Sequence, residues 1–245
     1  MRVDDAPDLR GLVPDRPYVG CDLRPGPGVT RVLAVGDSFT HCDQVKYEES
    51  WTHFLEAQLG LGFEVLNGGV PGYGTDQAFL RWQALGPKLK PRIVVLGILL
   101  EDVFRNVNIF RTFEHAGTRF PFSKPRFVIE GDGIGIINFP VVPPAEIPSV
   151  LEGLGSHPLG KLEYWYLPGL YEQKLLDVSR AVRFLRSRLL WRERSQRQKA
   201  ALGAGGEGLK VTARIAARFC AKVREGGGEP IVAVIPSQKD LAALK

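Results

Sequence analysis

The fold class is indicated first by RVLAVGD at residues 31–37, a short apolar run that ends in glycine and aspartate. Runs of this kind are typical of strands buried on both faces of a parallel sheet. FEVLN at 63–67 and RIVVLGILL at 92–100 have the same character, and helical patterns at 38–60 and 75–85 separate the three runs. Strands that alternate with helices in this way predict a parallel sheet with right-handed crossovers.

A fourth strand is predicted near the end of the sequence. EPIVAVIP at 229–236 is apolar, and it follows an amphipathic helical pattern at 209–227 and a glycine-rich break at 203–208. The sequence therefore predicts an α/β fold with a doubly wound, flavodoxin-like parallel sheet in the order 2-1-3-4 and helices on both faces. The usual fifth strand of such a sheet is missing, and no helix is expected after the fourth strand.

Two stretches interrupt this pattern. Residues 1–28 are rich in Pro, Asp and Gly, and they are expected to form an irregular arm before a single domain at 29–245. Residues 103–208 are expected to form an irregular insertion between the third and fourth strands, with a weak strand-like stretch at 126–139.

Within the insertion, residues 171–199 predict a long amphipathic helix. Apolar residues at steps of three and four run from Leu175 and Val178 through Val182 and Leu185 to Leu189, and arginines occupy the other faces. Three interpretations are open: a solvated face, contact with an anionic lipid or an acidic polysaccharide, and nucleic-acid binding. The last is not expected, because no aromatic-interleaved groove or nucleic-acid motif accompanies the basic residues.

Length and composition are those of an ordinary globular protein. The 245 residues (27.1 kDa) are 44% hydrophobic and 24% charged, which excludes low-complexity, collagen-like and coiled-coil classes. No apolar run approaches the roughly 20 residues that cross a bilayer. No secretory signal is recognisable, so a cytoplasmic location is expected. The net charge of +5 permits contact with an acidic surface without requiring it. Cys21, Cys42 and Cys220 are widely spaced and predict free thiols, with neither a disulfide framework nor a zinc site.

The first candidate for chemistry is Ser38, which follows Gly36 and Asp37 directly after the first strand. A serine at a strand-to-helix turn lies at the carboxyl edge of a parallel sheet, where such sheets bind ligands. Its backbone N–H is also close to a helix N-terminus, which favours developing negative charge. On these residues alone, a structural interpretation remains open, in which Gly36 makes the turn and Ser38 caps the helix.

A second signal is the loop that follows the second strand, NGGVPGYG at 67–74. In the order 2-1-3-4 the first two strands are neighbours, so this loop is expected beside Ser38. Its glycines allow the backbone to approach a ligand closely. A dinucleotide-binding loop is the rival interpretation, but the spacing G-x-G-x-x-G is absent and no acidic residue ends the next strand.

Together these residues resemble the SGNH (GDSL) hydrolases, most closely the bacterial branch with a long insertion after the third strand. The motifs that carry the resemblance are concentrated in residues 31–106, and the rest of the sequence matches only in the order of its predicted elements. It rests on four blocks: Gly36-Asp37-Ser38-Phe39-Thr40, Glu48-x-x-Trp51, Val65-Leu66-Asn67-x-Gly69-Val70-Pro71-Gly72-Tyr73-Gly74-Thr75-Asp76-Gln77 and Val94-Val95-Leu96-Gly97.

The resemblance implies a serine ester hydrolase that uses no metal or organic cofactor. Ser38 matches the nucleophile, and the backbone N–H groups of Ser38 and Gly72 match two of the three oxyanion-hole donors. The remaining candidate site residues are Asp37, Glu101 and Asp102 as part of the catalytic region, and Asn67, Gly69, Tyr73 and His41 as substrate-binding residues.

Two departures from the family pattern concern catalysis. The third oxyanion donor is normally an Asn side chain after the third strand, where this sequence has Glu101. An ionised carboxylate cannot donate a hydrogen bond and would repel an oxyanion. Asn106 and Asn108 lie further along as alternative donors. The family's base belongs to an Asp-x-x-His motif after a fifth strand, and none of the histidines, His41, His53, His115 and His157, follows an Asp at that spacing.

The sequence therefore leaves two functions open. The first is an SGNH-type hydrolase of an acyl ester or carbohydrate ester, impaired by these departures, or a related carbohydrate O-acetyltransferase. The second is a catalytically inactive binding or scaffold domain with the same fold. The strand at 229–236 would be an exposed sheet edge, so we expect a truncated or frameshifted chain, a degenerate relative, or an oligomer in which a partner covers this edge.

Overall fold

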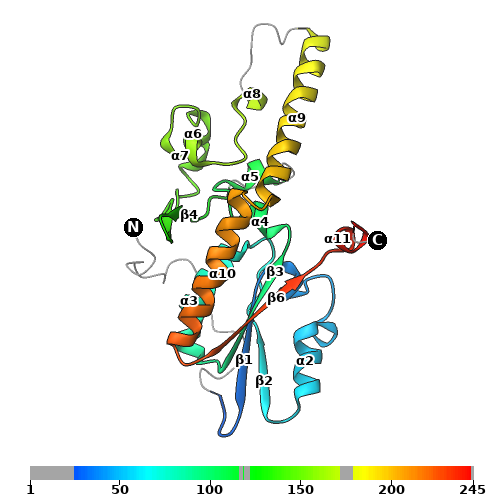
Figure 1. Ribbon diagram of the computed structural model, residues 1–245, viewed down its shortest axis with the longest axis vertical. Helices are drawn as coiled ribbons and strands as arrows, with labels where there is room; N and C mark the ends of the chain where they lie inside the picture. Colours follow the sequence, from blue (N-terminus) through cyan, green and yellow to red (C-terminus); the bar gives the residue numbers. More distant parts are fainter. Residues whose placement is uncertain (1–24, 116–117, 119–121, 172–178, 244–245) are drawn as a thin grey trace.

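The computed structural model describes residues 25–115, 118, 122–171 and 179–243. Four parallel strands form the central sheet in the order β2-β1-β3-β6 (Figure 1). Their bounds are β1 Thr30–Val35, β2 Phe63–Asn67, β3 Ile93–Leu99 and β6 Glu229–Ile235. Val32 of β1 lies opposite Val65 on one side and Ile93 on the other. The predicted α/β fold and strand order are confirmed.

Helices cover both faces of this sheet, because successive side chains of a buried strand point in opposite directions. Val32, Ala34, Val65 and Val95 pack against Trp51 and Leu55 of α2 (Trp51–Leu59). The alternate residues, among them Leu33, Val35 and Leu96, pack against α3 (Thr75–Leu89) and α10 (Glu207–Glu225). Each fully buried valine or leucine among these side chains contributes roughly 1.5–3 kcal/mol to folding.

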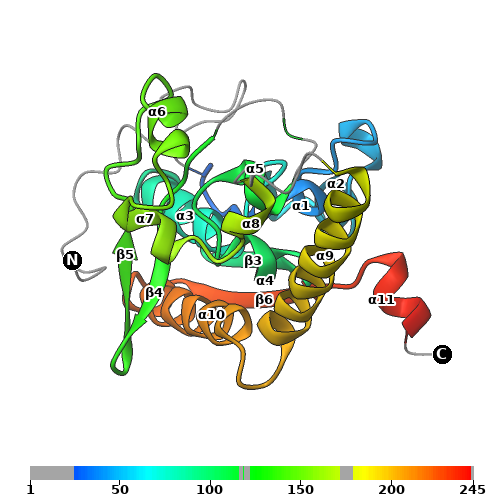
Figure 2. The same cartoon turned by 90° about the horizontal axis from the view of Figure 1, so that it is seen from above.

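The helix α10 joins the sheet to the insertion. Val211, Ile215, Phe219 and Val223 follow at steps of four and are all buried, which places one continuous stripe against the core. The hairpin of β4 (Arg126–Glu130) and β5 (Gly133–Ile137) forms a separate two-stranded antiparallel sheet that packs against α10 in the same core (Figure 2). The weak strand-like stretch at 126–139 is thus a hairpin, and Gly131 at φ +56° occupies its turn.

The rest of the insertion consists of short helices around a second apolar core, in which Trp165, Phe110 and Ile147 are fully buried. These helices are α4 Asp102–Arg105, α5 Arg111–Glu114, α6 Ile147–Glu152, α7 Pro158–Leu162 and α8 Pro168–Tyr171. The Glu163 carboxylate holds this region together, since it accepts hydrogen bonds from the backbone N–H groups of Ile109, Phe110 and Trp165 at 2.6–3.0 Å.

The long helix of the insertion differs from its prediction. α9 spans Arg180–Leu202, whereas a helix over 171–199 was expected; residues 172–178, with Leu175 and Val178, lie outside the described residues. Val182, Leu185 and Leu189, the rest of the predicted apolar stripe, are exposed. The side that faces the body instead carries Leu190 and Arg194, so the periodicity identified a helix but not its buried side.

The end of the chain also differs from its prediction. A short helix, α11 (Gln238–Ala243), follows β6, where no helix was expected. Ser237 and Asp240 stabilise its start reciprocally: the Ser237 backbone N–H donates to Asp240 Oδ2 at 2.8 Å, and the Asp240 N–H donates to Ser237 Oγ at 3.4 Å. Among the described strands β6 pairs only with β3, and its Ile231 and Val234 are exposed, as predicted for a sheet edge.

Cys42 and Cys220 are free thiols, and Cys21 lies outside the described residues. No helix in the described part of the chain is long and apolar enough to cross a bilayer.

Candidate active site

Ser38 is the first residue of α1 (Ser38–His41), a single helical turn at the carboxyl end of β1. Asp37 caps this turn, because its Oδ1 accepts the Phe39 backbone N–H at 2.9 Å. The Ser38 side chain is half-buried, and its hydroxyl has no hydrogen-bond partner among the described residues. Asp37 rather than Ser38 therefore acts as the cap, which leaves the serine hydroxyl available to a substrate.

The glycine-rich loop packs directly on this turn, as the strand order predicts. The backbone N–H of Gly68 donates to Ala34 O at 2.6 Å, and that of Val70 donates to Gly36 O at 3.0 Å. A Cβ on Gly69 would overlap the backbone of His41, so only glycine permits this close approach. The loop after β2 and the turn after β1 thus form one rigid unit.

Asn67 joins the two segments with every polar atom of its side chain. Its Nδ2 donates to Thr40 O at 2.8 Å and to Thr52 Oγ1 at 3.1 Å, and its Oδ1 accepts the Gly69 N–H at 3.0 Å. Asn67 and Gly69, predicted as substrate-binding residues, are therefore engaged in positioning the loop beside Ser38.

Gly72 adopts φ +80°, a conformation that favours glycine. Within the described part of the chain, the backbone N–H groups of Gly72 and Ser38 have no acceptor. The Arg111 guanidinium lies nearby, with Nη2 3.8 Å from where a Cβ of Gly72 would be. Two free donors and a neighbouring cation are suited to binding a negatively charged oxygen.

Arg105 ties the two strand ends and the loop together beneath the surface. Its Nη1 donates to Asp37 Oδ2 at 3.1 Å, to Asp102 Oδ1 at 2.9 Å and to Tyr73 O at 3.0 Å. Asp37, Asp102 and Arg105 are all buried, so the cation balances carboxylates that would otherwise be desolvated without a partner. Asp37 and Asp102 were predicted for the catalytic region, and their contacts are those of residues that position Ser38 and the loop.

Asp102 has an altered pKa in this cluster. Burial raises the pKa of Asp102 well above its usual range, and the neighbouring Asp37 raises it further. Arg105 and the hydrogen bond from the Leu99 backbone N–H at 3.1 Å oppose that rise. The site therefore holds one carboxyl group that retains its proton more readily than a solvated aspartate.

Glu101 stands at the position where the resemblance implies an asparagine. It lies in the turn between β3 and α4, its side chain is half exposed, and its Oε1 is 3.4 Å from Arg105 Nη2. Asn106 does not replace the missing donor, because its amide donates to Thr212 Oγ1 at 2.7 Å and accepts from the Asp76 N–H at 3.1 Å. The Asn108 amide donates to the Phe110 carbonyl at 3.0 Å.

None of the four histidines makes a hydrogen bond to Ser38 in the described structure. His41, predicted near the substrate, is the exposed last residue of α1. His53 packs edge-on against a tyrosine ring in front of α2, His115 ends α5, and His157 caps α7 through its Nδ1. The described residues therefore contain no histidine that is hydrogen-bonded to Ser38.

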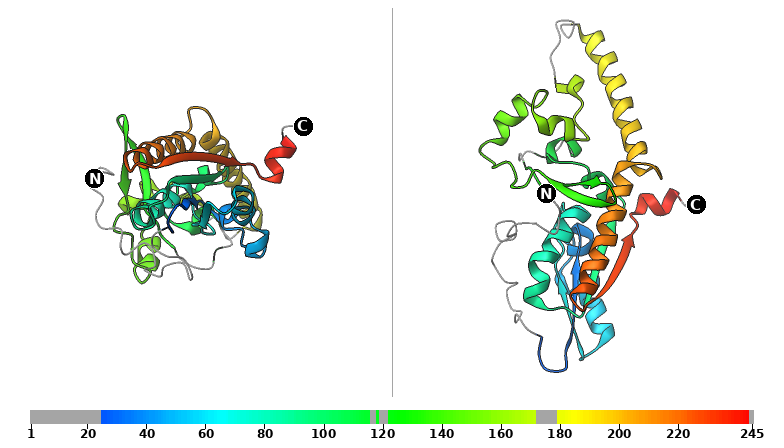
Figure 3. Two further views of the ribbon diagram at one scale, coloured as in Figure 1. Left: turned by 90° about the horizontal axis from the view of Figure 1, so that it is seen from below. Right: turned by 60° about the vertical axis from the view of Figure 1, so that its left-hand side comes forward.

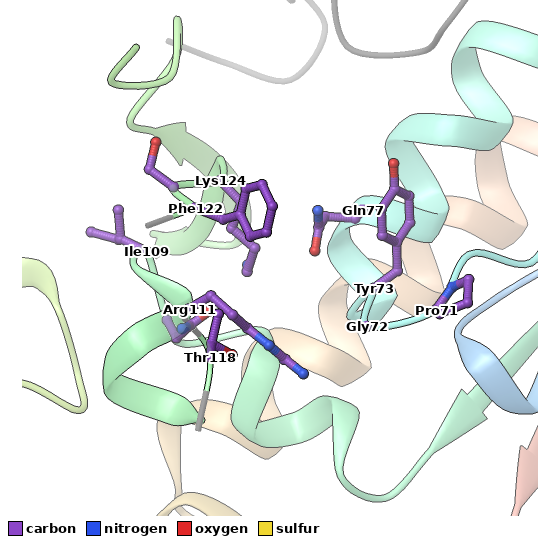
Figure 4. Close-up of a pocket in the computed structure, with 11 residues that line it drawn as sticks. Pro71, Gly72, Tyr73, Gln77, Ile109, Arg111, Thr118, Phe122 and Lys124 are labelled. Atoms are coloured by element: carbon purple, nitrogen blue, oxygen red, sulfur yellow. The ribbon is translucent and has the colours of Figure 1, made fainter. Parts of the chain in front are cut away.

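A cavity of about 360 Å³ opens beside Gly72, between the glycine-rich loop and the insertion (Figure 4). Tyr73 and Gln77 line one side and Phe122 lines the opposite side, with Arg111 at the end towards Gly72 (Figure 4). Aromatic rings together with amide and cationic groups suit a ligand that is both apolar and rich in oxygen. Tyr73, predicted as a substrate-binding residue, lines this cavity.

Sequence reasoning missed Arg105, Arg111 and Lys124. Lys124 also lines the cavity, and it forms an ion pair with the buried Asp76 at the start of α3. All three lie in or at the edge of the insertion, which has no strong periodicity. The spacing of Asp102 and Arg105 by three residues was the one local signal for the ion pair.

The described residues contain no group of three or more His, Cys, Asp or Glu side chains that could hold a metal ion.

Comparison with known proteins finds only limited similarity to solved structures. No family model matches the sequence, and no curated protein matches it. Among solved structures, TesA is 26% identical over 31% of this chain and 44% of its own, with a TM-score of 0.29. AlinE4, described as an SGNH-hydrolase family esterase, is 23% identical over 33% of this chain and 46% of its own, with a TM-score of 0.30. The chain thus spans less than half the length of these structures.

Proposed function

We propose that this chain is a serine ester hydrolase of the SGNH type, in which Ser38 forms an acyl-enzyme with an acyl ester or a carbohydrate ester. The observation that carries this function is the turn between β1 and α1. There the Ser38 hydroxyl and the backbone N–H groups of Ser38 and of Gly72 in the adjoining loop have no partners in the described structure. Free donors at a strand-to-helix turn are what acyl transfer requires.

In this mechanism Ser38 Oγ attacks the ester carbonyl carbon and loses its proton to a base that His41, the insertion or a second chain supplies. The carbonyl oxygen becomes an oxyanion, which accepts hydrogen bonds from the N–H groups of Ser38 and Gly72. The C–O bond to the alcohol then breaks, and the alcohol leaves with a proton. Water hydrolyses the acyl-enzyme, or a sugar hydroxyl accepts the acyl group in an O-acetyltransferase reaction. The cavity beside Gly72 would hold the part of the substrate next to the carbonyl.

Turnover by this chain alone is expected to be slow. Loss of the histidine of a comparable serine triad lowers kcat by about 10⁶-fold. Loss of one oxyanion donor, as at Glu101, lowers it by about 10²–10³-fold. The same two features favour the second candidate function, a binding domain that retains the site without turnover.

Labelling with a fluorophosphonate, read by intact mass, tests the first function. We expect one adduct on the wild-type protein and none on Ser38→Ala, while Ser156→Ala, which changes an exposed serine, is labelled like the wild type. Added imidazole should accelerate labelling because it supplies the missing base. Folded protein that gives no adduct, even with imidazole, would contradict the hydrolase and leave the binding domain.

A further inference from the structure

The most unusual surface of the described structure lies on α9. Phe184, Leu185, Leu189 and Trp191 are each more than half exposed. On a helix they occupy one half of the circumference together with Arg188 and Arg192, because successive residues turn by about 100°. We call these six residues the outer face of α9. Burying large apolar side chains is favourable, so a surface of this kind marks an interaction site.

The opposite side of α9 is fixed to the body of the protein. Arg194 donates to the Glu114 carbonyl at 2.8 Å, and its guanidinium lies 5.3 Å from the centre of the Trp165 ring. Arg197 donates to the Tyr164 carbonyl at 2.7 Å. These contacts hold the helix in one orientation, with its outer face turned away. Figures 1 and 3 show α9 extending beyond the sheet at one end of the molecule.

The charge of α9 is strongly unbalanced. Arg180–Leu202 contains seven arginines and one lysine but only one acidic residue, Glu193. Glu193 pairs with Arg197, on the inner side. The outer face therefore combines two arginines that form no ion pair within the described part of the chain with aromatic and aliphatic side chains.

This combination of charge and apolar side chains distinguishes between the candidate binding partners of the outer face. A second copy of α9 would bring like charges together, which costs free energy. A nucleic acid or an acidic polysaccharide would satisfy the arginines but offers no apolar volume for Leu185 and Leu189. A bilayer with anionic headgroups offers both, because arginine side chains reach the headgroups while neighbouring apolar residues enter the acyl boundary.

We propose that the outer face of α9 docks on an anionic lipid surface, with the helix lying in the plane of the membrane interface. Docking in this way holds the protein on the membrane without crossing it. It needs no turnover at Ser38, so it stands whether the chain is a hydrolase or a binding domain.

Sedimentation of the full chain with vesicles tests the docking. We expect binding to phosphatidylcholine vesicles that contain phosphatidylserine, weak binding to phosphatidylcholine alone, and loss of binding as salt rises. Each basic residue at such a surface contributes about fivefold to affinity, so Arg188→Gln with Arg192→Gln should weaken binding about 25-fold. Lys210→Gln with Arg224→Gln removes the same charge from exposed positions of α10 and should have little effect.

A second pair of variants tests the apolar half of the outer face. Leu185→Gln with Leu189→Gln keeps every charge and should also weaken vesicle binding at least tenfold, because insertion of the leucines is lost. Trp191 supplies an independent readout: its fluorescence should shift to shorter wavelength on binding, and Trp191→Phe should reduce that shift. Circular dichroism confirms that each variant is folded.

Three results would overturn the docking. They are equal binding to neutral vesicles, arginine variants that bind like the α10 control, and leucine variants that bind vesicles as tightly as the wild type. Binding to dextran sulfate that survives the leucine changes, without vesicle binding, would assign the face to an acidic polymer instead.

Discussion

The buried ion pair at Arg105 gives the sharpest quantitative prediction. Arg105→Met removes the cation that lies 3.1 Å from Asp37 and 2.9 Å from Asp102, and both carboxyl groups are only 1% exposed. Removing one partner of a buried pair costs about 3–5 kcal/mol, because the remaining charge is desolvated without compensation. We expect a loss of that size in the free energy of unfolding near neutral pH.

The loss should depend on pH. Without Arg105, protonation of one of the two carboxyl groups stabilises the folded variant. Each pH unit changes the free energy of that protonation by about 1.4 kcal/mol. The deficit of the variant should therefore shrink by up to about 2.7 kcal/mol between about pH 7 and about pH 5.

Urea unfolding followed by circular dichroism measures both effects. Arg92→Met is the matched control, because Arg92 pairs with Glu229 at an exposed position, and it should cost no more than about 1 kcal/mol. Equal losses for the two variants, or a loss at Arg105 that does not change with pH, would refute the assignment of Arg105 as the balancing charge. Fluorophosphonate labelling of the Arg105 variant should also fall, since Asp37 and the Tyr73 carbonyl lose their common anchor.

Three further changes test the site, and a fourth tests the second apolar core. Gly69→Ala forces a methyl group against the backbone of α1 and should destabilise by about 1–3 kcal/mol, whereas Gly62→Ala, in open space, should not lower the melting temperature. Thr40→Val replaces a buried hydroxyl that has no partner in the described structure. The free energy of unfolding in urea should therefore be unchanged or rise by about 1 kcal/mol, and a decrease would mean that the hydroxyl makes a hydrogen bond. Glu101→Asn should accelerate fluorophosphonate labelling by about 10²-fold, and an unchanged rate would separate this position from the oxyanion. Burial raises the pKa of Glu163, so the folded protein keeps a proton that the unfolded chain loses, and stability should fall as pH rises through that raised pKa. Glu163→Gln should flatten this part of a plot of urea midpoint against pH. A slope equal to that of the wild type would contradict the assignment to Glu163.

Short continuous apolar runs made the sheet predictable. The four runs were each found to within about two residues of their observed bounds, because short apolar runs bounded by Gly, Pro or polar residues are typical of strands in a parallel sheet. Their order followed from the connection rules for parallel strands. Ser38 and the loop at 67–74 could be selected because they follow strands that are neighbours in this order, whereas Gly72 within that loop was selected from the family resemblance.

Other features depend on partners that are distant in sequence. Arg105 is separated from Asp37 by 68 residues, so no local window contains the ion pair. The exposure of Leu185 and Leu189 could not be predicted, because helical spacing defines a stripe without showing what covers it. The start of α11 was predictable in principle, since Ser237 and Asp240 have the spacing of a capping box.

The position of the insertion has a consequence for the order in which the protein folds. β1, β2 and β3 are complete within residues 30–99, but β6, which pairs with β3, begins only at Glu229. During synthesis the β3 edge therefore stays unpaired until more than a hundred further residues have left the ribosome. Contacts of such high sequence separation slow folding, and an open strand edge can pair with another chain in the meantime. Ser38 and its loop belong to the early part, so a nascent chain can assemble this turn before the sheet is closed.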